Sequence, residues 1–325
     1  MRRIDDEQGG RYRNLPRLPD LTGSDRGCAT GGRFARRRGA DRAAFTLHSS
    51  LLHRAAPPVA LPDPSPSAAP DAATPSDVAP FEAGAPRAVV VIPTYNEAAS
   101  VRAVLARVWA LPVRIDVLVV DDGSPDGTAE IVAAEQAAHG GRLHLIRRAG
   151  KLGLGTAYVA GFRRARALGY DIVCEMDADL SHNPDDLPRL VAPLADGTAD
   201  VAVGSRYVGG VRVMNWPLSR LMLSYGASLY VRAITRMPVY DVTAGFVAWH
   251  RRVLDALDLS AVRSNGYSFQ VEMKYRAWSR HFRLVEVPIV FTERAEGQSK
   301  MSKAIMREAA WKVWELRARA LTGRL

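Results

Sequence analysis

The chain has 325 residues, of which 47% are apolar, so it can bury the core of one large domain or two small ones. Its two cysteines, Cys28 and Cys174, lie far apart and outside any cluster of metal-ligating residues, which argues against a disulfide framework and indicates a reduced, intracellular protein. The net charge is +10, and residues 206–325 hold 20 basic against 9 acidic side chains. A basic half attracts phosphates, but charge alone leaves nucleic acid, nucleotides and lipid headgroups open.

No run of apolar residues approaches the roughly 18 that a membrane-spanning helix needs. No apolar stretch follows the first ten residues, so we expect no secretory signal and at most a peripheral membrane contact. Residues 1–85 are rich in Arg, Gly, Pro and Ala without helix or strand periodicity, which predicts a disordered arm with solvated arginines. We expect the folded domain over residues 86–325, with Cys174 as a buried structural thiol.

Strand and helix patterns alternate after residue 87. Short β-branched apolar runs predict strands over 88–93, 115–122, 142–148 and 170–179. Apolar residues at helical spacing predict helices over 128–139, over 155–169 and from Asn96 to about Leu111. This alternation is typical of an α/β fold with a doubly wound, mostly parallel sheet that carries helices on both faces.

Polar clusters follow three of these strands: PTYNE (93–97), DDGSPDG (121–127) and DADLSH (177–182). The carboxyl ends of parallel strands meet at one edge of a sheet, which is where open α/β sheets bind ligands. We therefore expect the three clusters to converge on one crevice.

Asp177 and Asp179 are the strongest candidates for chemistry. Alternate residues of an extended chain point the same way, and two carboxylates with waters and phosphate oxygens suit Mg²⁺ or Mn²⁺. The competing interpretation is an acidic turn or helix cap before NPDDLPRL. No Walker A motif is present, and GKLGLGT matches the dinucleotide fingerprint poorly, which leaves Lys151 open as a phosphate contact or an exposed lysine. Tyr95 offers a ring to a base, and Glu97 offers an acceptor to ribose or base donors.

The motifs PTYNE, VVDDGSPDGT, KLGLGTAY, MDADLSH, GSRYVGG and FTER with GQSKM, in this order, resemble the family-2 glycosyltransferases, and more narrowly the dolichol-phosphate (polyprenol-phosphate) mannose synthases. The resemblance covers about residues 88–303. It implies a GT-A fold, GDP-mannose as donor, a divalent metal (Mg²⁺ or Mn²⁺) and polyprenyl phosphate as acceptor. One inversion at the sugar would give the β-mannosyl phosphate.

The resemblance also implies roles for individual residues. The nucleotide sugar would be bound by Pro93, Tyr95, Glu97, Val120, Asp122, Asp177, Ala178, Asp179, Arg206, Arg294 and Lys300. The metal would be held by Asp177 and Asp179, and catalysis would depend on Asp179, Arg206 and Arg294. The acceptor phosphate would meet Arg220, Ser299 and Lys300. Ser181 departs from the family pattern, because some relatives have glutamine there.

Two basic amphipathic segments, 220–237 and 306–321, either lie on an anionic membrane surface or pack on the sheet with their charges in water. We expect peripheral attachment at the cytoplasmic face of the membrane, a separate membrane-protein subunit as a possible partner, and no nucleic acid. The alternative activities are transfer of glucose or GlcNAc from a UDP-sugar, and nucleotide or nucleic-acid binding without catalysis. A processive polysaccharide synthase is disfavoured, since QVEMKYRAW has the wrong spacing for its QxxRW motif.

Overall fold

The computed structural model describes residues 84–264, 266–292, 303–323 and 325, with the side chains of 303–308 excepted. The predicted arm lies outside the described residues except for its last two positions. Predicted site residues Arg294, Ser299 and Lys300 also lie outside them.

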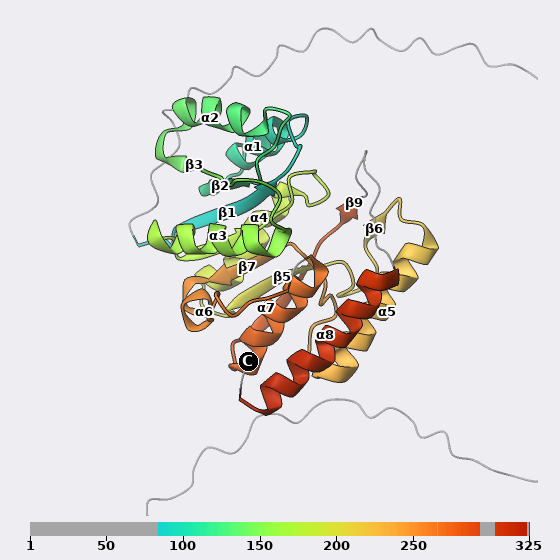
Figure 1. Cartoon of the computed structure of the whole chain (residues 1–325). Helices are drawn as coiled ribbons and strands as arrows, with labels where there is room; N and C mark the ends of the chain where they lie inside the picture. Colours follow the sequence, from blue (N-terminus) through green and yellow to red (C-terminus); the bar gives the residue numbers. More distant parts are fainter. Residues whose placement is uncertain (1–83, 265, 293–302, 324) are drawn as a thin grey trace, which may run out of the picture. The chain divides into compact units, whose positions relative to one another are not determined.

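A seven-stranded sheet forms the centre of the domain (Figure 1). Its strand order is β3-β2-β1-β4-β7-β5-β8, and every neighbouring pair is parallel except the two that involve β7. The strands are β1 (Ala88–Thr94), β2 (Ile115–Asp121), β3 (Leu143–Arg147), β4 (Ile172–Glu175), β5 (Val201–Ser205), β7 (Val247–His250) and β8 (Leu284–Pro288). The predicted mostly parallel α/β sheet is confirmed, whereas the antiparallel insertion of β7 was not foreseen.

Helices cover both faces of the sheet because alternate strand residues point to opposite sides. Val90 and Ile92 pack beneath α1 (Val101–Trp109), α2 (Thr128–His139) and α4 (Leu187–Ala195). Val89 and Val91 pack beneath α3 (Leu154–Ala167), and the same core contains residues of α6 (Arg251–Ala256) and α7 (Tyr267–Ser279). Short 3₁₀ turns, η1 (Gly140–Arg142) and η2 (Pro184–Asp186), connect elements of the first face.

Gly161 lets α3 approach the sheet closely. A Cβ atom at this position would lie 2.4 Å from Cγ1 of Val91 on β1. Such a distance is far inside van der Waals contact, so only glycine fits between this helix and this strand.

The first helix begins later than its pattern predicts. Residues 96–100 precede α1, and Asn96 has a φ of +62°. The amides of Asn96, Glu97 and Ala98 bond to side chains of the loop after β2 instead of starting a helix. These bonds satisfy the backbone donors and bind the first two polar loops together.

The basic half of the domain adds a two-stranded sheet, β6 (Val213–Met214) with β9 (Phe291–Thr292), and two long helices. These helices, α5 (Leu218–Thr235) and α8 (Lys303–Leu321), lie side by side, and α8 also packs against α7. The Tyr230 hydroxyl on α5 donates to the carbonyl of Ala310 on α8, at 3.2 Å. In the described part of the chain, no helix combines the length and apolar character that crossing a bilayer requires.

Candidate active site

The carboxyl ends of β1, β2, β4 and β5 open onto one edge of the sheet, and so does the loop that enters β7. All three polar clusters found in the sequence therefore lie at this edge, as predicted. The strand order places the Asp177–Asp179 loop after β4, between the loops of β1 and β2 on one side and Arg206 after β5 on the other. This edge thus carries the polar loops of β1 and β2 on one side, an acidic loop at its centre and Arg206 on the other side.

The predicted nucleotide residues form a coherent group on β1 and β2. Pro93 and Val120 are register partners on the two strands. The Tyr95 ring is 37% exposed, and the Lys151 ammonium lies 4.4 Å from its centroid. The Glu97 carboxylate accepts from the Ser100 hydroxyl at 2.7 Å, just before the start of α1. An exposed aromatic ring beside a cation offers a stacking surface for a base.

Asp122 is buried and lies among groups that hold it in place. Its Oδ1 lies 2.8 Å from Nη1 of Arg148, and its Oδ2 accepts from the Leu152 amide at 3.2 Å. Burial raises the pKa of Asp122 above its ordinary value, and Arg148 and the Leu152 amide offset part of that rise. Arg148 Nη2 donates to the Thr156 hydroxyl at 2.6 Å, which joins this carboxylate to the first turn of α3. The sequence reasoning missed Arg148, although it is the last residue of a predicted strand.

The acidic centre follows β4. Asp177 Oδ1 accepts from the buried Tyr158 hydroxyl at 3.4 Å, and Asp179 Oδ1 accepts from the Ser181 amide at 3.0 Å. Burial, and then the Asp177 and Glu175 charges, raise the pKa of Tyr158, so its hydroxyl stays protonated and able to donate. Ala178 between the two acids is buried, and the Asp177 amide donates to Nδ1 of His182 at 3.2 Å.

This donor set fits a hard divalent cation that takes its remaining ligands from a substrate and from water. Both candidate side chains offer carboxylate oxygens, and the described residues contain no group of three or more His, Cys, Asp or Glu that could hold a metal alone. Mg²⁺ and Mn²⁺ commonly take one or two carboxylates and complete their shells with water and phosphate oxygens. Ser181 is buried at the same loop, and its hydroxyl has no hydrogen-bond partner among the described residues.

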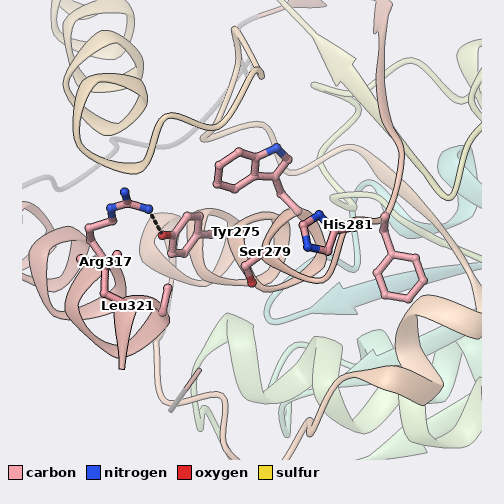
Figure 2. Close-up of a pocket in the computed structure, with 8 residues that line it drawn as sticks. Tyr275, Ser279, His281, Arg317 and Leu321 are labelled. Atoms are coloured by element: carbon pink, nitrogen blue, oxygen red, sulfur yellow. Dashed lines mark hydrogen bonds between the residues drawn. The ribbon is translucent and has the colours of Figure 1, made fainter. Parts of the chain in front are cut away.

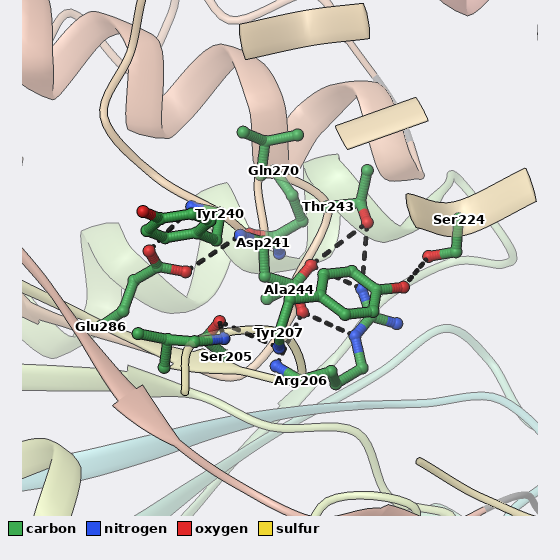
Figure 3. Close-up of polar contacts among 12 residues, drawn as sticks. Ser205, Arg206, Tyr207, Ser224, Tyr240, Asp241, Thr243, Ala244, Gln270 and Glu286 are labelled. Carbon is green, nitrogen blue, oxygen red and sulfur yellow. Dashed lines mark hydrogen bonds and ion pairs between the residues drawn. The ribbon is translucent and has the colours of Figure 1, made fainter. Parts of the chain in front are cut away.

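Arg206 lies at the predicted edge, where its guanidinium is bonded to the segment before β7 (Figure 3). It is 6% exposed, and its Nε and Nη2 donate to the two carboxylate oxygens of Asp241, both at 2.7 Å. The Thr243 hydroxyl accepts a further bond from Nη2 at 3.0 Å. Burial alone lowers the pKa of Arg206, but the Asp241 carboxylate outweighs it, and the net pKa is raised. Sequence reasoning missed Asp241 and Thr243, although DVTAGF placed two polar residues immediately before β7.

Aromatic rings surround the basic side. The Arg206 guanidinium carbon lies 5.3 Å from the centroid of Trp216 and 5.6 Å from that of Phe291. Arg220, predicted from the family resemblance, lies on α5 with its guanidinium carbon 4.3 Å from the centroid of the same indole. Arg206 and Arg220 therefore share one aromatic neighbour, and the structure brings these two predicted arginines together.

A hollow of about 460 Å³ lies apart from this edge, between α7 and the end of α8 (Figure 2). Tyr275 and Trp278 line one side, and Arg317 lines the other and donates to the Tyr275 hydroxyl at 3.2 Å. None of the predicted site residues that the structure describes borders it.

Comparisons with known proteins agree with this geometry. Residues 89–257 match the model of glycosyl transferase family 2. The chain is 47% identical over 235 residues to the polyprenol monophosphomannose synthase of Mycolicibacterium smegmatis, a match that covers 72% of this chain and 88% of that protein. It is also 47% identical to the undecaprenyl-phosphate mannosyltransferase of Micrococcus luteus, over 72% of this chain and 96% of that protein.

A solved structure supports the fold. Glucosyl-3-phosphoglycerate synthase from Mycobacterium tuberculosis, in complex with Mn²⁺, UDP-glucose and phosphoglyceric acid, aligns with a TM-score of 0.54 at 22% identity. The alignment covers 73% of this chain and 81% of that one. The predicted GT-A fold is confirmed, as is the resemblance to polyprenyl-phosphate mannose synthases, and the chain belongs to glycosyl transferase family 2.

Proposed function

We propose that this enzyme transfers mannose from GDP-mannose to a polyprenyl phosphate, in one inverting and metal-dependent step. The observation that carries the proposal is the strand order, in which β4 stands between the strands of the nucleotide side and the strand of Arg206. A donor whose base lies over Tyr95 then extends its diphosphate toward Asp177 and Asp179. The names of the two relatives at 47% identity support both mannose and a polyprenyl phosphate.

The reaction needs little acid–base chemistry from the protein. The second pKa of a phosphomonoester is about 6, so the acceptor oxygen is already anionic near neutral pH. That oxygen forms a bond to C1 of mannose while the bond from C1 to the diphosphate breaks, and GDP leaves with the electron pair. The result is polyprenyl β-mannosyl phosphate from an α-linked donor.

The main obstacle is the approach of one anion to another. Asp177 and Asp179 would hold a Mg²⁺ or Mn²⁺ ion, and that ion would neutralise the departing diphosphate. On the acceptor side, Arg206 and Arg220 supply positive charge around Trp216 and hold the incoming phosphate for in-line attack. Because Asp241 takes two donors of Arg206, we assign that arginine a fixed rather than a mobile role. Arg294, Ser299 and Lys300 remain proposed phosphate contacts from the family motif.

Exposed apolar side chains on α5 and α8 support a membrane role. Helix α5 contains no acidic residue. Its exposed large apolar side chains are Leu218, Met222, Leu223, Tyr225, Leu229 and Tyr230. On α8, Trp311 is 73% and Trp314 is 53% exposed. Indole rings with nearby basic residues suit the headgroup region of a bilayer. We propose that these two helices lie on an anionic membrane surface at its cytoplasmic face, where a polyprenyl chain is accessible; a separate membrane subunit could share this surface.

The deciding experiment measures label transferred from radioactive GDP-mannose into butanol-extractable lipid. Purified protein is incubated with a polyprenyl phosphate, with Mg²⁺, with Mn²⁺ or with a chelator. Metal-dependent label in the lipid is the expected result. Label from UDP-glucose or UDP-GlcNAc, but not from GDP-mannose, would replace the proposed donor with the alternative sugar and keep the acceptor. Absence of transfer from every donor, with added membranes, would contradict the catalytic proposal.

A further inference from the structure

Helix α7 carries a lysine that has no contact with solvent. Lys274 is 0% exposed, and its ammonium donates to the carbonyl oxygens of Val242 at 3.3 Å and Ala244 at 2.7 Å. It also donates to Gln270, one turn earlier in the helix. A buried ammonium costs free energy unless every donor is satisfied, so four acceptors around one lysine indicate a specific task.

The neighbouring charges balance this lysine. Glu175, at the end of β4, is also fully buried and accepts from the Trp249 indole at 2.6 Å and from the Gln270 amide. Glu175, Asp241 and Glu286 are the nearby anions, and Arg206 is the nearby cation. Burial is the main reason that the pKa of Lys274 is lowered to about 8, and the three carboxylates oppose that fall. The Lys274 ammonium is therefore surrounded by anions at the basic side of the candidate site.

The turn over residues 241–245 divides its contacts between the two cations. Its odd-numbered side chains, Asp241 and Thr243, hold Arg206. Its even-numbered carbonyls, at Val242 and Ala244, accept from the Lys274 ammonium. Figure 3 shows Asp241 and Thr243 directed at Arg206, with Gln270 of α7 next to the turn. The turn that presents Asp241 to Arg206 is therefore also held by α7.

We propose that Lys274 is a positioning residue that acts through this turn to hold Arg206 in place for a phosphate group of the substrates. The inference rests on the proposed function, because it assigns to Arg206 the contact with that phosphate. Lys274 itself touches no substrate. A misplacement of about 1 Å at a reacting group costs about 100-fold in rate, so a turn that is held on one side only would impair transfer.

If Lys274 only stabilised the fold, its loss would lower activity no more than the loss of another buried ion pair. A buried ion pair on α7 provides this control. Arg276 pairs with Glu272 at 2.7 Å, and both side chains are at most 3% exposed. These two residues bond to the Ala261 carbonyl and the Ser264 amide, not to the turn before β7. Loss of this pair removes one buried anion and one buried cation, as E175Q/K274M does, without touching the support of Arg206.

The experiment compares E175Q, E175Q/K274M and E272Q/R276M with the unmodified protein. Each double variant replaces one anion and one cation by neutral side chains of similar shape, so neither leaves a lone buried charge. Melting temperature, kcat and KM for polyprenyl phosphate are measured for each. We expect kcat/KM of E175Q/K274M to fall about 100-fold below that of E175Q. E272Q/R276M should stay within about threefold of the unmodified protein, at a comparable loss of melting temperature.

A second readout needs no catalysis. In protein labelled with nitrogen-15 arginine, the Arg206 Nε–H signal reports its bond to Asp241, and we expect protection from solvent exchange in E175Q but not in E175Q/K274M. The inference is wrong if E175Q/K274M keeps both that protection and the kcat/KM of E175Q, or if the two double variants lose activity equally. If the unmodified protein fails to transfer mannose, the proposed function fails, and the arginine signal still decides whether Lys274 holds Arg206.

Discussion

Arg148 Nη1 and a carboxylate oxygen of Asp122 lie 2.8 Å apart, and the two side chains are only 10% and 8% exposed. This pair joins the end of β2 to the loop before α3, at the side of the crevice assigned to the nucleotide. An ionised Asp122 can accept hydrogen bonds from a base, whereas a protonated one loses that capacity in part. Arg148 therefore favours the ionised form of Asp122, which is the form that the proposed nucleotide contact requires.

Replacement of Arg148 by Met should weaken GDP binding about tenfold, because the buried carboxylate loses its cation and its pKa rises further. The loss should shrink as the pH is raised, since a higher pH restores the ionised form. Calorimetric titration with GDP and Mn²⁺ measures both effects. Arg147→Met is the control, because Arg147 is half-exposed and pairs with Glu130 on the surface. Equal losses in the two variants would contradict a specific role for Arg148.

Replacement of Asp179 by Asn should abolish the metal dependence of nucleotide binding. The variant keeps the shape of the side chain but removes one of two proposed anionic ligands, so Mn²⁺ should no longer raise the affinity for GDP. Mannose transfer should fall about 100-fold or more, given the share of the barrier that a metal removes. Asp185→Asn is the matched control in the same segment, since Asp185 is exposed and pairs with Arg107. Undiminished stimulation of GDP binding by Mn²⁺ in D179N would move the metal site elsewhere.

Much of the fold and part of the site could be predicted from the sequence. The strand patterns at β1, β2 and β4 are strong because each is a short, buried, apolar run, and a parallel sheet fixes where their polar ends meet. Asp177 and Asp179 were identified on that basis, whereas Asp122 was implied by the resemblance to the family. The start of α1 was misjudged, because hydrogen bonds from the neighbouring loop replaced the first helical turn.

The parts that escaped prediction depend on long-range contacts. Asp241 holds Arg206 across 35 positions of sequence, which no local pattern records. Lys274 stands in a helix that is buried on both sides, between the sheet and α8, so the usual interpretation of a lysine as a solvent-facing residue fails there. A charged residue inside a helix with no polar face is the signal that could have marked it.

The exposed tryptophans of α8 should determine how strongly the protein binds membranes. In W311S/W314S, two large rings leave the proposed lipid-facing surface, and partition onto vesicles that contain anionic lipid should fall about tenfold or more. Sedimentation with vesicles measures the partition. Melting temperature should change little, since the buried face of α8 is formed by Val313 and Leu316.

A control and a functional readout accompany that variant. Val113→Ser alters an exposed apolar residue in the loop between α1 and β2. This loop lies at the edge of the sheet opposite the candidate site, so the variant should leave vesicle binding unchanged. Transfer to a short, water-soluble polyprenyl phosphate should also be unaffected in W311S/W314S, whereas transfer to vesicle-borne acceptor should fall. Unchanged sedimentation of the double variant would show that α8 does not face the lipid.

His144 should make the stability of the domain depend on pH. The Tyr170 hydroxyl donates to Asp116 at 2.8 Å and lies 2.9 Å from His144 Nε2, which indicates that this nitrogen carries the proton of a neutral imidazole. Burial lowers the pKa of His144 from 6.5, Arg164 and Arg87 lower it further, and Asp116 opposes them. The unfolded chain therefore binds a proton at a higher pH than the folded chain does.

The free energy of unfolding should accordingly fall as the pH drops below about 6.5, because the unfolded state then binds more protons than the folded state. His144→Gln keeps a donor for the Tyr170 oxygen but cannot titrate, so its stability should decline less over this interval. Denaturant titrations at several pH values give the two slopes. His250, whose pKa is also lowered by burial, contributes equally to both proteins, so the difference between the slopes isolates His144. Identical slopes would mean that His144 takes up its proton with the same pKa in the folded and unfolded chains.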